Sequence, residues 1–176
     1  MTTATITVRR LGASDAAAAV PDLADVLIDC VHGGASVGFM APLARAKALA
    51  FWQGVADCVA RGERALLVAQ DSSGGTVGTV QLVLSLPENQ PHRADVAKML
   101  VLRSARRQGV AAQLLQAVDA VALQERRTVL VLDTVTGGDA ARVYARAGWQ
   151  PVGDVPGYAL MPDGALCSTR FFYKTL

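Results

Sequence analysis

The chain has 176 residues, of which 52% are hydrophobic and 18% are charged, and its formal net charge is +2. A chain this apolar can bury a large core, which argues against disorder, and its length suits one domain over residues 1–176. The small net charge does not predict the strongly basic face of a nucleic-acid binder, so we expect no nucleic-acid partner.

Cysteine usage and hydropathy limit the function further. The three cysteines, Cys30, Cys58 and Cys167, are far apart and form no CxxC pair, so neither a disulfide framework nor a metal site is predicted. The first residues lack the basic and then apolar pattern of a signal peptide, and no apolar run approaches the ~20 residues of a membrane span. We therefore expect a soluble, cytoplasmic protein without a membrane partner.

A strand and two helices are expected at the start of the chain. β-Branched residues predict a strand at 4–11. Pro21 interrupts a helical pattern that begins near residue 14, so we expect the better helix to start near Asp22. A second helix is expected over 42–62.

A hairpin and a further strand then lead into a long helix. Strands are expected at 64–70 and 75–86, because the intervening "DSSGG" is typical of a tight turn. A loosely alternating strand follows at 93–102. An amphipathic helix with one wide apolar face is expected at 109–126.

The C-terminal part adds strands and one short helix. "TVLVLDT" at 128–134 is a continuous apolar run and predicts a strand buried on both faces. A short helix is expected at 137–148, a strand at 149–155, a loop at 156–168 and a last strand at 169–176. The order of elements predicts an α+β domain, layered α/β/α, with a mixed, mostly antiparallel sheet of about six or seven strands and helices on both faces.

The segment "RSARRQGVAAQLL", at 103–115, joins a strand to the long helix. The first turn of a helix has free N–H groups and the positive end of the helix dipole, so it attracts anions. Gly109 and Ala111 are small enough for a diphosphate to approach the backbone, and Arg106 and Arg107 can add charge-assisted bonds. A polar turn without a ligand is the alternative. The pattern is neither G-x-G-x-x-G nor a Walker A loop.

Two segments resemble motifs of the GNAT superfamily of N-acetyltransferases. "RRQGVA", which begins at Arg106, resembles the R/Q-x-x-G-x-G/A motif, and it stands after a strand at the start of the long helix. "AARVYARAGW" resembles A-x-x-L-Y-x-x-x-G-F/W, with Tyr144 in the tyrosine position. The order of elements agrees over nearly the whole chain. Within the superfamily, "DVAKMLV", "LDTVTGG", "PGYALMPDG" and "FFYK" look most like the tabtoxin-resistance-type acetyltransferases.

The resemblance implies that acetyl-CoA is the cosubstrate and that a primary amine of a small molecule attacks it directly in a ternary complex. It implies that backbone N–H groups at the helix start hold the pyrophosphate, and that the preceding strand end pairs with the pantetheine amides. The residues implied to contact acetyl-CoA are Leu100, Val101, Leu102, Arg106, Arg107, Gln108, Gly109, Val110, Ala111 and Ala112. Relatives are often homodimers, and no metal is implied.

Three residues are candidates for proton transfer. A protonated amine needs a base, and the resemblance implies that Asp95 or Asp133 accepts its proton. We expect partial burial at a strand end to raise the pKa of Asp133. The alternatives are a cap or strand-end role for Asp133 and an outward-facing strand position for Asp95. Tyr144 resembles the general acid that protonates the leaving thiolate, although an aromatic residue at helical spacing is also typical of a core.

The acceptor side is less defined by the sequence. Phe39, Met40, Phe51 and Trp52 could line an acceptor pocket, although core packing is preferred for Phe51. A backbone N–H near Val101 is expected to stabilise charge on the attacked carbonyl oxygen. The rival functions are a protein or aminoacyl-tRNA acetyltransferase and a non-catalytic acyl-CoA sensor. A candidate base and a candidate acid together favour the enzyme.

Overall fold

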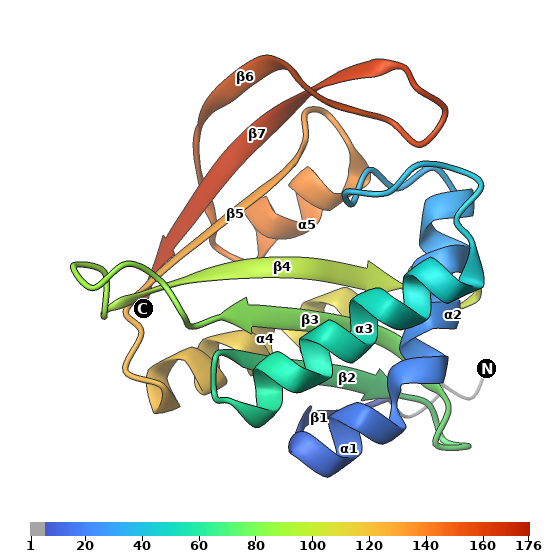
Figure 1. Ribbon diagram of the computed structural model, residues 1–176. Helices are drawn as coiled ribbons and strands as arrows, with labels where there is room; N and C mark the ends of the chain where they lie inside the picture. The colour runs from blue at the N-terminus through green and yellow to red at the C-terminus, as the bar shows by residue number, and fades with distance from the viewer. Residues whose placement is uncertain (1–5) are drawn as a thin grey trace.

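The computed structural model describes residues 6–176 and contains one seven-stranded sheet in the order β1-β2-β3-β4-β5-β7-β6 (Figure 1). The strands are β1 (Thr7–Leu11), β2 (Arg64–Gln70), β3 (Thr76–Val83), β4 (Arg93–Val101), β5 (Val129–Val135), β6 (Gln150–Leu160) and β7 (Leu166–Thr175). The helices are α1 (Ala13–Ala18), α2 (Val20–His32), α3 (Arg45–Ala60), α4 (Val110–Gln124) and α5 (Asp139–Arg146). Every neighbouring pair of strands is antiparallel except β4 and β5, so the predicted mixed, mostly antiparallel sheet is confirmed.

The sheet lies between two apolar cores. Leu66 and Val68 of β2 pack with α1, α2 and α3, whereas Leu67 and Ala69 pack on the other face with α4 and α5. Successive side chains of a strand point to opposite faces, so one continuous apolar run serves both cores. The expected α/β/α layering with helices on both faces is therefore confirmed.

The β2–β3 turn forms as its sequence predicts. Gly74 has a φ of +84°, a backbone conformation that favours glycine. The Asp71 carboxylate accepts hydrogen bonds from the backbone N–H groups of Ser73 and Gly75 over 2.9 and 3.0 Å. The hairpin therefore fixes the register of the two central strands.

The helix boundaries near the N-terminus differ from the expectation. α1 forms as a separate short helix, and α2 begins at Val20 rather than near Asp22. Pro21 lies in the first turn of α2, where a missing N–H breaks no helical hydrogen bond, so it starts a helix instead of interrupting one. Residues 4 and 5 of the expected first strand lie outside the described residues.

The expected loop at 156–168 is wrong, because β6 and β7 continue into it. β6 reaches Leu160 and β7 starts at Leu166, which leaves a short turn between them. The strand pairing shifts register between Val155 and Ala159, and Gly157 within that bulge has a φ of +58°. The Pro156–Gly157 pair thus marks a bulge inside a strand rather than the end of the strand.

The β4–β5 pair opens a gap in the middle of the sheet. The two strands pair only from Arg93 to Asp95 on β4, and beyond Asp95 they diverge. A second irregularity lies on the other edge of β4, where the register with β3 shifts around Lys98, whose φ is +51°. The bulge and the gap together leave part of β4 without a neighbour on the β5 side.

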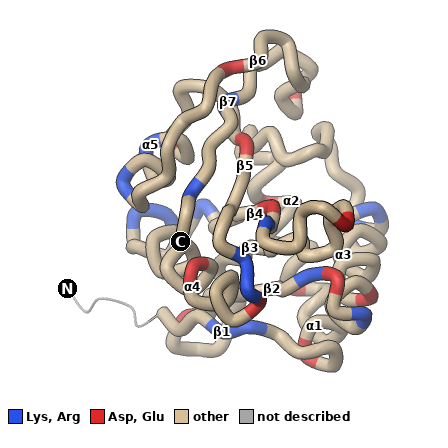
Figure 2. Tube along the Cα trace, turned by 90° about the vertical axis from the view of Figure 1, so that its left-hand side faces the viewer, with Lys and Arg blue, Asp and Glu red and all other residues tan. Residues whose placement is uncertain are grey.

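Two further properties of the described residues are the distribution of charge and the apolar character of the helices. Positive and negative residues are interspersed along the described trace (Figure 2), in keeping with the small net charge. Between residues 6 and 176 no helix combines the length and the apolar character that crossing a bilayer requires.

Candidate active site

The loop before α4 forms a cradle of unpaired backbone N–H groups. Within the described residues, the N–H groups of residues 107–112 donate no hydrogen bond, because these residues enclose the first turn of α4. Gly109 is the N-cap residue with a φ of +80°, and a Cβ built on it meets no atom within 4 Å. The cradle therefore opens toward solvent and carries the positive end of the helix dipole.

The cradle is held in place from two sides. The Asp29 carboxylate on α2 accepts hydrogen bonds from the backbone N–H and from Nε of Arg103, both over 2.8 Å. On β3, a Cβ at Gly78 would lie 3.0 Å from the Leu100 carbonyl oxygen and 3.1 Å from Val110, so glycine allows α4 to pack closely on the sheet. The start of α4 is thus fixed against β3 and α2.

The arginine side chains lie at the rim of the cradle. Arg106 directs its Nε to the Val101 carbonyl oxygen over 3.4 Å, and Gln108 donates to the Ser104 carbonyl oxygen over 3.0 Å. Arg107 is exposed and has a φ of +62°. Backbone groups therefore form the base of the cradle, and the arginines can add charge only from its edge.

The end of β4 presents one residue to the gap. Leu102 donates its N–H to the Val77 carbonyl oxygen over 2.9 Å, and Leu100 pairs with Thr79, so both face β3. Backbone groups alternate in direction along a strand, which turns those of Val101 toward the gap. The Val101 carbonyl oxygen already accepts from Arg106 and from the Cys30 thiol. Of the three residues expected to pair with the pantetheine amides, Leu100, Val101 and Leu102, only Val101 turns its backbone groups toward the gap.

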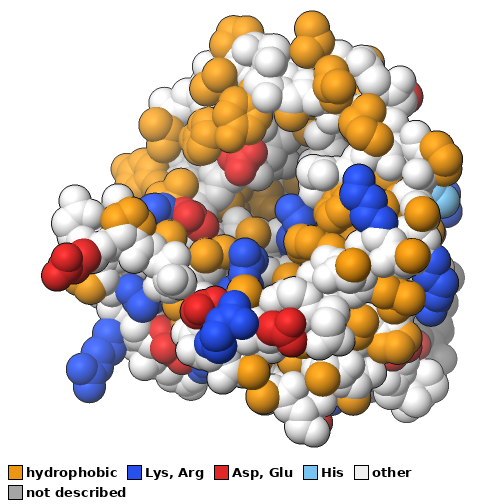
Figure 3. All heavy atoms as spheres, in the orientation of Figure 1, with side chains coloured by type: hydrophobic (Ala, Val, Ile, Leu, Met, Phe, Trp, Pro, Cys, Tyr) orange, Lys and Arg blue, Asp and Glu red, His pale blue; other side chains and the backbone are white. Residues whose placement is uncertain are grey.

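A pocket of about 360 Å³ lies where β4 and β5 diverge. It is visible as a hollow below the β6–β7 hairpin in Figure 3, with acidic and basic side chains on its walls. Its lining comes from α3, β2, β3, β4, β5 and β7 and consists of Phe51, Arg64, Val83, Asp95, Val96, Ala97, Lys98, Val131, Leu132, Asp133 and Phe171. Both candidate bases therefore line one pocket.

The two candidate bases differ in their partners. Asp95 is half-buried and forms an ion pair with Arg93, which also binds the Gln90 side chain. Asp133 accepts a hydrogen bond of 3.2 Å from Thr169 Oγ1 and has no cation within 4 Å among the described residues. Asp133 thus has the freer carboxylate of the two.

The expected partial burial of Asp133 is wrong. Its side chain is exposed, because the preceding residue, Leu132, takes the buried side of β5 and strand alternation turns Asp133 into the open pocket.

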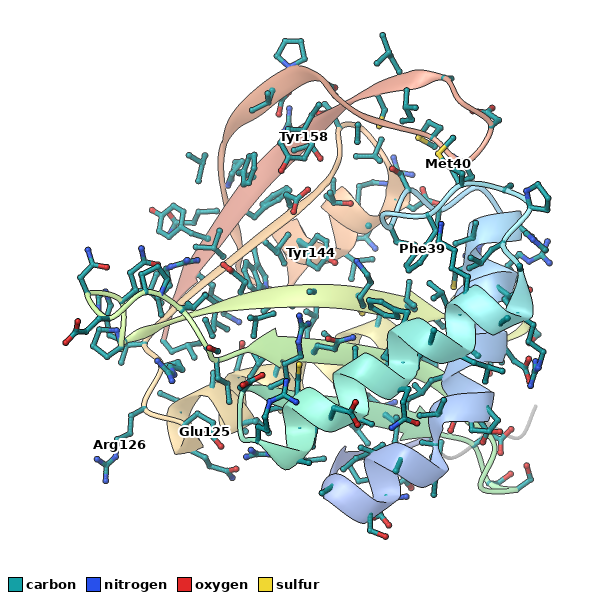
Figure 4. All side chains as sticks on the ribbon, in the orientation of Figure 1. Phe39, Met40, Glu125, Arg126, Tyr144 and Tyr158 are labelled. Atoms are coloured by element: carbon teal, nitrogen blue, oxygen red, sulfur yellow. The ribbon has the colours of Figure 1, made fainter. Side chains whose placement is uncertain are left out.

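Tyr144 on α5 is buried, with an exposed fraction of 6%. Its ring packs against Trp149 and Phe172, with centroid distances of 6.0 and 5.9 Å. The hydroxyl has no protein partner among the described residues, yet it is not sealed from solvent, and Figure 4 shows the residue between β4 and β5. Burial, together with the negative charge of Asp133, raises the pKa of Tyr144 above its ordinary value. Tyr144 is thus a core aromatic whose hydroxyl has no protein partner among the described residues.

Four apolar residues that could line the acceptor side separate into two groups. Trp52 is fully buried and belongs to the core, whereas Phe51 is half-buried and lines the pocket. Phe51 also packs against the core of α1, α2 and α3, so its ring lies at the margin between that core and the pocket. Phe39 stacks edge-on against Phe51 at 5.2 Å, and Met40 is exposed on the same loop (Figure 4).

The loop that carries Phe39 is bound to the end of the β6–β7 hairpin. Ala41 donates its backbone N–H to the Pro162 carbonyl oxygen over 3.0 Å, and Ser36 Oγ donates to the Leu160 carbonyl oxygen over 2.9 Å. These contacts join the segment between α2 and α3 to the β6–β7 turn. The α2–α3 loop and the β6–β7 turn therefore hold each other in place.

The cysteines do not offer a nucleophile in the pocket. Cys30 is 1% exposed, and burial raises the pKa of its thiol. Cys58 accepts a hydrogen bond from Arg61 at the far end of α3, and the Cys167 thiol on β7 donates to the Ala159 carbonyl oxygen on β6. A cysteine-based two-step mechanism has no support in these positions.

Two cationic residues that line the pocket, Lys98 and Arg64, are not among the site residues expected from the sequence. Lys98 stands between Ala97 and the apolar run Met99–Val101 on β4, and a charge among apolar strand residues is a signal that could have drawn attention to it. Arg64 gives no comparable signal, since its partner Gln81 is on another strand, with Arg64 Nη1 2.6 Å from Gln81 Oε1.

The family model for the acetyltransferase (GNAT) domain matches residues 62–151, which is just over half of the chain. The fold is similar to that of an Acinetobacter baylyi ADP1 protein assigned as an acetyltransferase, with a TM-score of 0.82, 12% identity, and coverage of 100% of this chain and 94% of that one. It is similar to the ribosomal-protein-alanine N-acetyltransferase of Brucella melitensis, with a TM-score of 0.78, 20% identity and coverage of 97% and 99%. A Salmonella typhimurium protein assigned as an acetyltransferase and solved with its cofactor acetyl-CoA gives a TM-score of 0.76, 16% identity and coverage of 98% and 94%.

Proposed function

The chain belongs to the GNAT acetyltransferase family, and from this premise we propose that it transfers the acetyl group of acetyl-CoA to the primary amine of a small molecule. The observation that carries the proposal is the cradle of unpaired N–H groups at residues 107–112, directly beside the gap between β4 and β5. A diphosphate at this position accepts hydrogen bonds from the backbone and meets the positive end of α4. The same cofactor is present in the similar Salmonella structure.

Val101 contributes to both binding and chemistry in this proposal. Its backbone faces the gap, so it pairs with an extended arm that leads from the cradle toward the pocket. Its N–H is the donor that stabilises negative charge on the thioester carbonyl oxygen during attack. Acetyl-CoA supplies an activated acyl group, and the protein supplies orientation and proton transfer.

Asp133 is the proposed base. An amine that arrives as an ammonium must lose a proton before its nitrogen can attack, and the free Asp133 carboxylate in the pocket accepts it directly or through one water. Asp95 is less suited, because Arg93 occupies part of its carboxylate. As the nitrogen–carbon bond forms and the carbon–sulfur bond breaks, the acylated nitrogen releases its second proton to solvent and becomes the neutral amide.

Tyr144 is the proposed acid. Its hydroxyl at the gap donates a proton to the departing thiolate and recovers one from solvent. The raised pKa keeps the phenol protonated at neutral pH, although it makes the group a weaker acid than a free phenol. Placement rather than acidity is therefore its main contribution.

The size of the pocket favours a small acceptor over a protein or a tRNA. A volume of about 360 Å³ is near the lower end of the ~300–1,000 Å³ range of small-molecule sites. The segments "DVAKMLV" and "LDTVTGG", which carry Asp95, Lys98 and Asp133, support assignment to the tabtoxin-resistance type.

Release of free coenzyme A thiol, measured with three acceptor classes, tests this function. We expect thiol release with a panel of small primary amines, and little release with N-terminal peptides or aminoacyl-tRNA at equal concentration. Faster release with peptides or tRNA would contradict the small-molecule assignment. Tight binding of acetyl-CoA without release in any class would instead indicate a sensor.

A further inference from the structure

The pocket contains two cations that have no carboxylate partner. Lys98 and Arg64 both line it, and neither forms an ion pair within 4 Å among the described residues. Arg64 is fixed by the fully buried Gln81, with 2.6 Å between Arg64 Nη1 and Gln81 Oε1. Lys98 Nζ lies 5.6 Å from the centroid of the Phe51 ring. A cation–π contact offsets only part of the hydration that a half-buried ammonium loses.

Lys98 occupies an unusual backbone position. It lies in the β4 bulge with a φ of +51°, which non-glycine residues seldom adopt. The bulge interrupts the alternation of β4, where Ala94 and Val96 are buried, and turns an ammonium into the pocket instead of a further core residue. Strained backbone conformations of this kind are concentrated at active sites and ligand-binding sites.

The negative charges of the pocket do not neutralise these cations. Asp95 is paired with Arg93, and Asp133 forms no ion pair with Lys98 although both line the same pocket. Burial lowers the pKa of Lys98, the charge of Arg64 lowers it further, and Asp133 acts in the opposite direction. The pocket thus has a free negative group at Asp133 and a separate positive group at Lys98 and Arg64.

We propose that Lys98 and Arg64 bind an anionic group of the acceptor, so that the acceptor is a small amine that also carries a carboxylate, of the amino-acid class. The ammonium of such a molecule lies toward Asp133, and its carboxylate lies between the Lys98 ammonium and the Arg64 guanidinium. This inference rests on the proposed acetyl transfer and adds the substrate class to it. Charge-assisted hydrogen bonds to a desolvated carboxylate give the selection.

The test compares amino acids with their primary amides as acceptors. The amide keeps the amine and the side chain and carries an uncharged group in place of the carboxylate. For the wild-type chain we expect kcat/KM to be about 10-fold or more higher for the acid, as expected for a charged hydrogen bond. Lys98→Met removes this preference by raising the acceptor KM for the acid far more than for the amide, whereas Lys98→Arg keeps the preference.

Lys47→Met is the matched control. Lys47 also lies over a ring, 5.8 Å from the centroid of Phe39, but it is exposed on α3 and does not line the pocket. We expect it to leave the preference for acids intact. The affinity for acetyl-CoA is measured on each variant, and thermal unfolding checks that each one folds.

Two results would overturn the inference. One is a wild-type chain that acetylates acids and amides equally well. The other is a Lys98→Met variant that loses kcat equally for both, which would make Lys98 a base or a structural residue. Calorimetric binding of the same acids and amides, without turnover, separates this claim from the proposed function. Tighter binding of acids to the wild type than to Lys98→Met supports the subsite even if no acetyl transfer occurs, and equal binding refutes it.

Discussion

The hydroxyl of Thr169 on β7 donates a hydrogen bond of 3.2 Å to the Asp133 carboxylate on β5. Thr169 is 3% exposed, and its hydroxyl lies 3.2 Å from the Thr134 carbonyl oxygen as well, so its single proton is shared between that carbonyl and one carboxylate oxygen of Asp133. The other oxygen of Asp133 faces the pocket. This arrangement orients a base without neutralising it, which an ion pair would do.

Replacing Asp133 tests which carboxylate acts as the base. We expect Asp133→Asn to lower kcat by about 100-fold or more, the usual size of a general-base contribution, with little change in acetyl-CoA affinity. Asp95→Asn is the matched control, and because Asp95 is paired with Arg93 it should lower kcat far less. Steady-state kinetics with one acceptor measure kcat for the two variants. A larger loss of kcat in Asp95→Asn than in Asp133→Asn would assign the base to Asp95.

Tyr144→Phe tests the proton donor. Burial and the charge of Asp133 raise the pKa of Tyr144, so the phenol stays protonated up to at least about pH 9. We expect the variant to lower kcat by about 100-fold and by the same factor throughout that range. A contradictory result would be a wild-type kcat that falls at alkaline pH while the kcat of Tyr144→Phe does not. That result would indicate a proton donor with a lowered pKa.

The same shift predicts how stability depends on pH. An unfolded tyrosine loses its proton near pH ~10, whereas folded Tyr144 holds its proton to higher pH. The unfolded state therefore binds fewer protons above that pH, and the free energy of unfolding falls as the pH rises. Denaturant unfolding at increasing alkaline pH should show a smaller loss in Tyr144→Phe than in the wild type. Equal losses would mean that Tyr144 titrates normally.

Much of the fold follows from local patterns in the sequence. "DSSGG" specifies its turn, and the run from Ala65 to Ala69 has the apolar continuity of a strand covered on both faces. The cradle at Gly109 could also be predicted, because a glycine before an amphipathic helix defines both the positive φ and the free N–H groups.

The pocket could not be predicted, because its properties come from long-range geometry. Asp133 is exposed because β4 and β5 diverge beside it, and no local pattern encodes that divergence. Arg64 is a candidate ligand only because Gln81 pairs with it from the next strand. Phe51 and Trp52 are adjacent and similar in character, yet they point into the pocket and the core respectively.

That difference between Phe51 and Trp52 gives a prediction. Trp52→Ala removes a fully buried ring and should lower the free energy of unfolding by about 3–5 kcal/mol. Phe51→Ala should cost less stability and raise the acceptor KM, because its ring lines the pocket. Chemical denaturation and acceptor kinetics measure the two effects, and an unchanged KM in Phe51→Ala would remove that ring from the site.

The cradle is tested by a pair of glycine variants. Gly109→Val introduces a branched side chain at a φ of +80° in the space where a diphosphate would lie, and should weaken acetyl-CoA binding by about 10-fold or more. Gly164→Val imposes the same kind of strain at a φ of +94° in the β6–β7 turn, away from α4. Calorimetry with acetyl-CoA compares them, and similar losses in both would mean that backbone strain alone explains the effect.

The most direct measurement of the central claim is mass spectrometry of a pool of small amines incubated with acetyl-CoA and the wild-type chain. The account predicts new N-acetyl amides, formed in equal amount with free coenzyme A and strongly reduced with Asp133→Asn. Acetyl-CoA that binds to the chain and stays intact, with no amide formed from any amine in the pool, would contradict it.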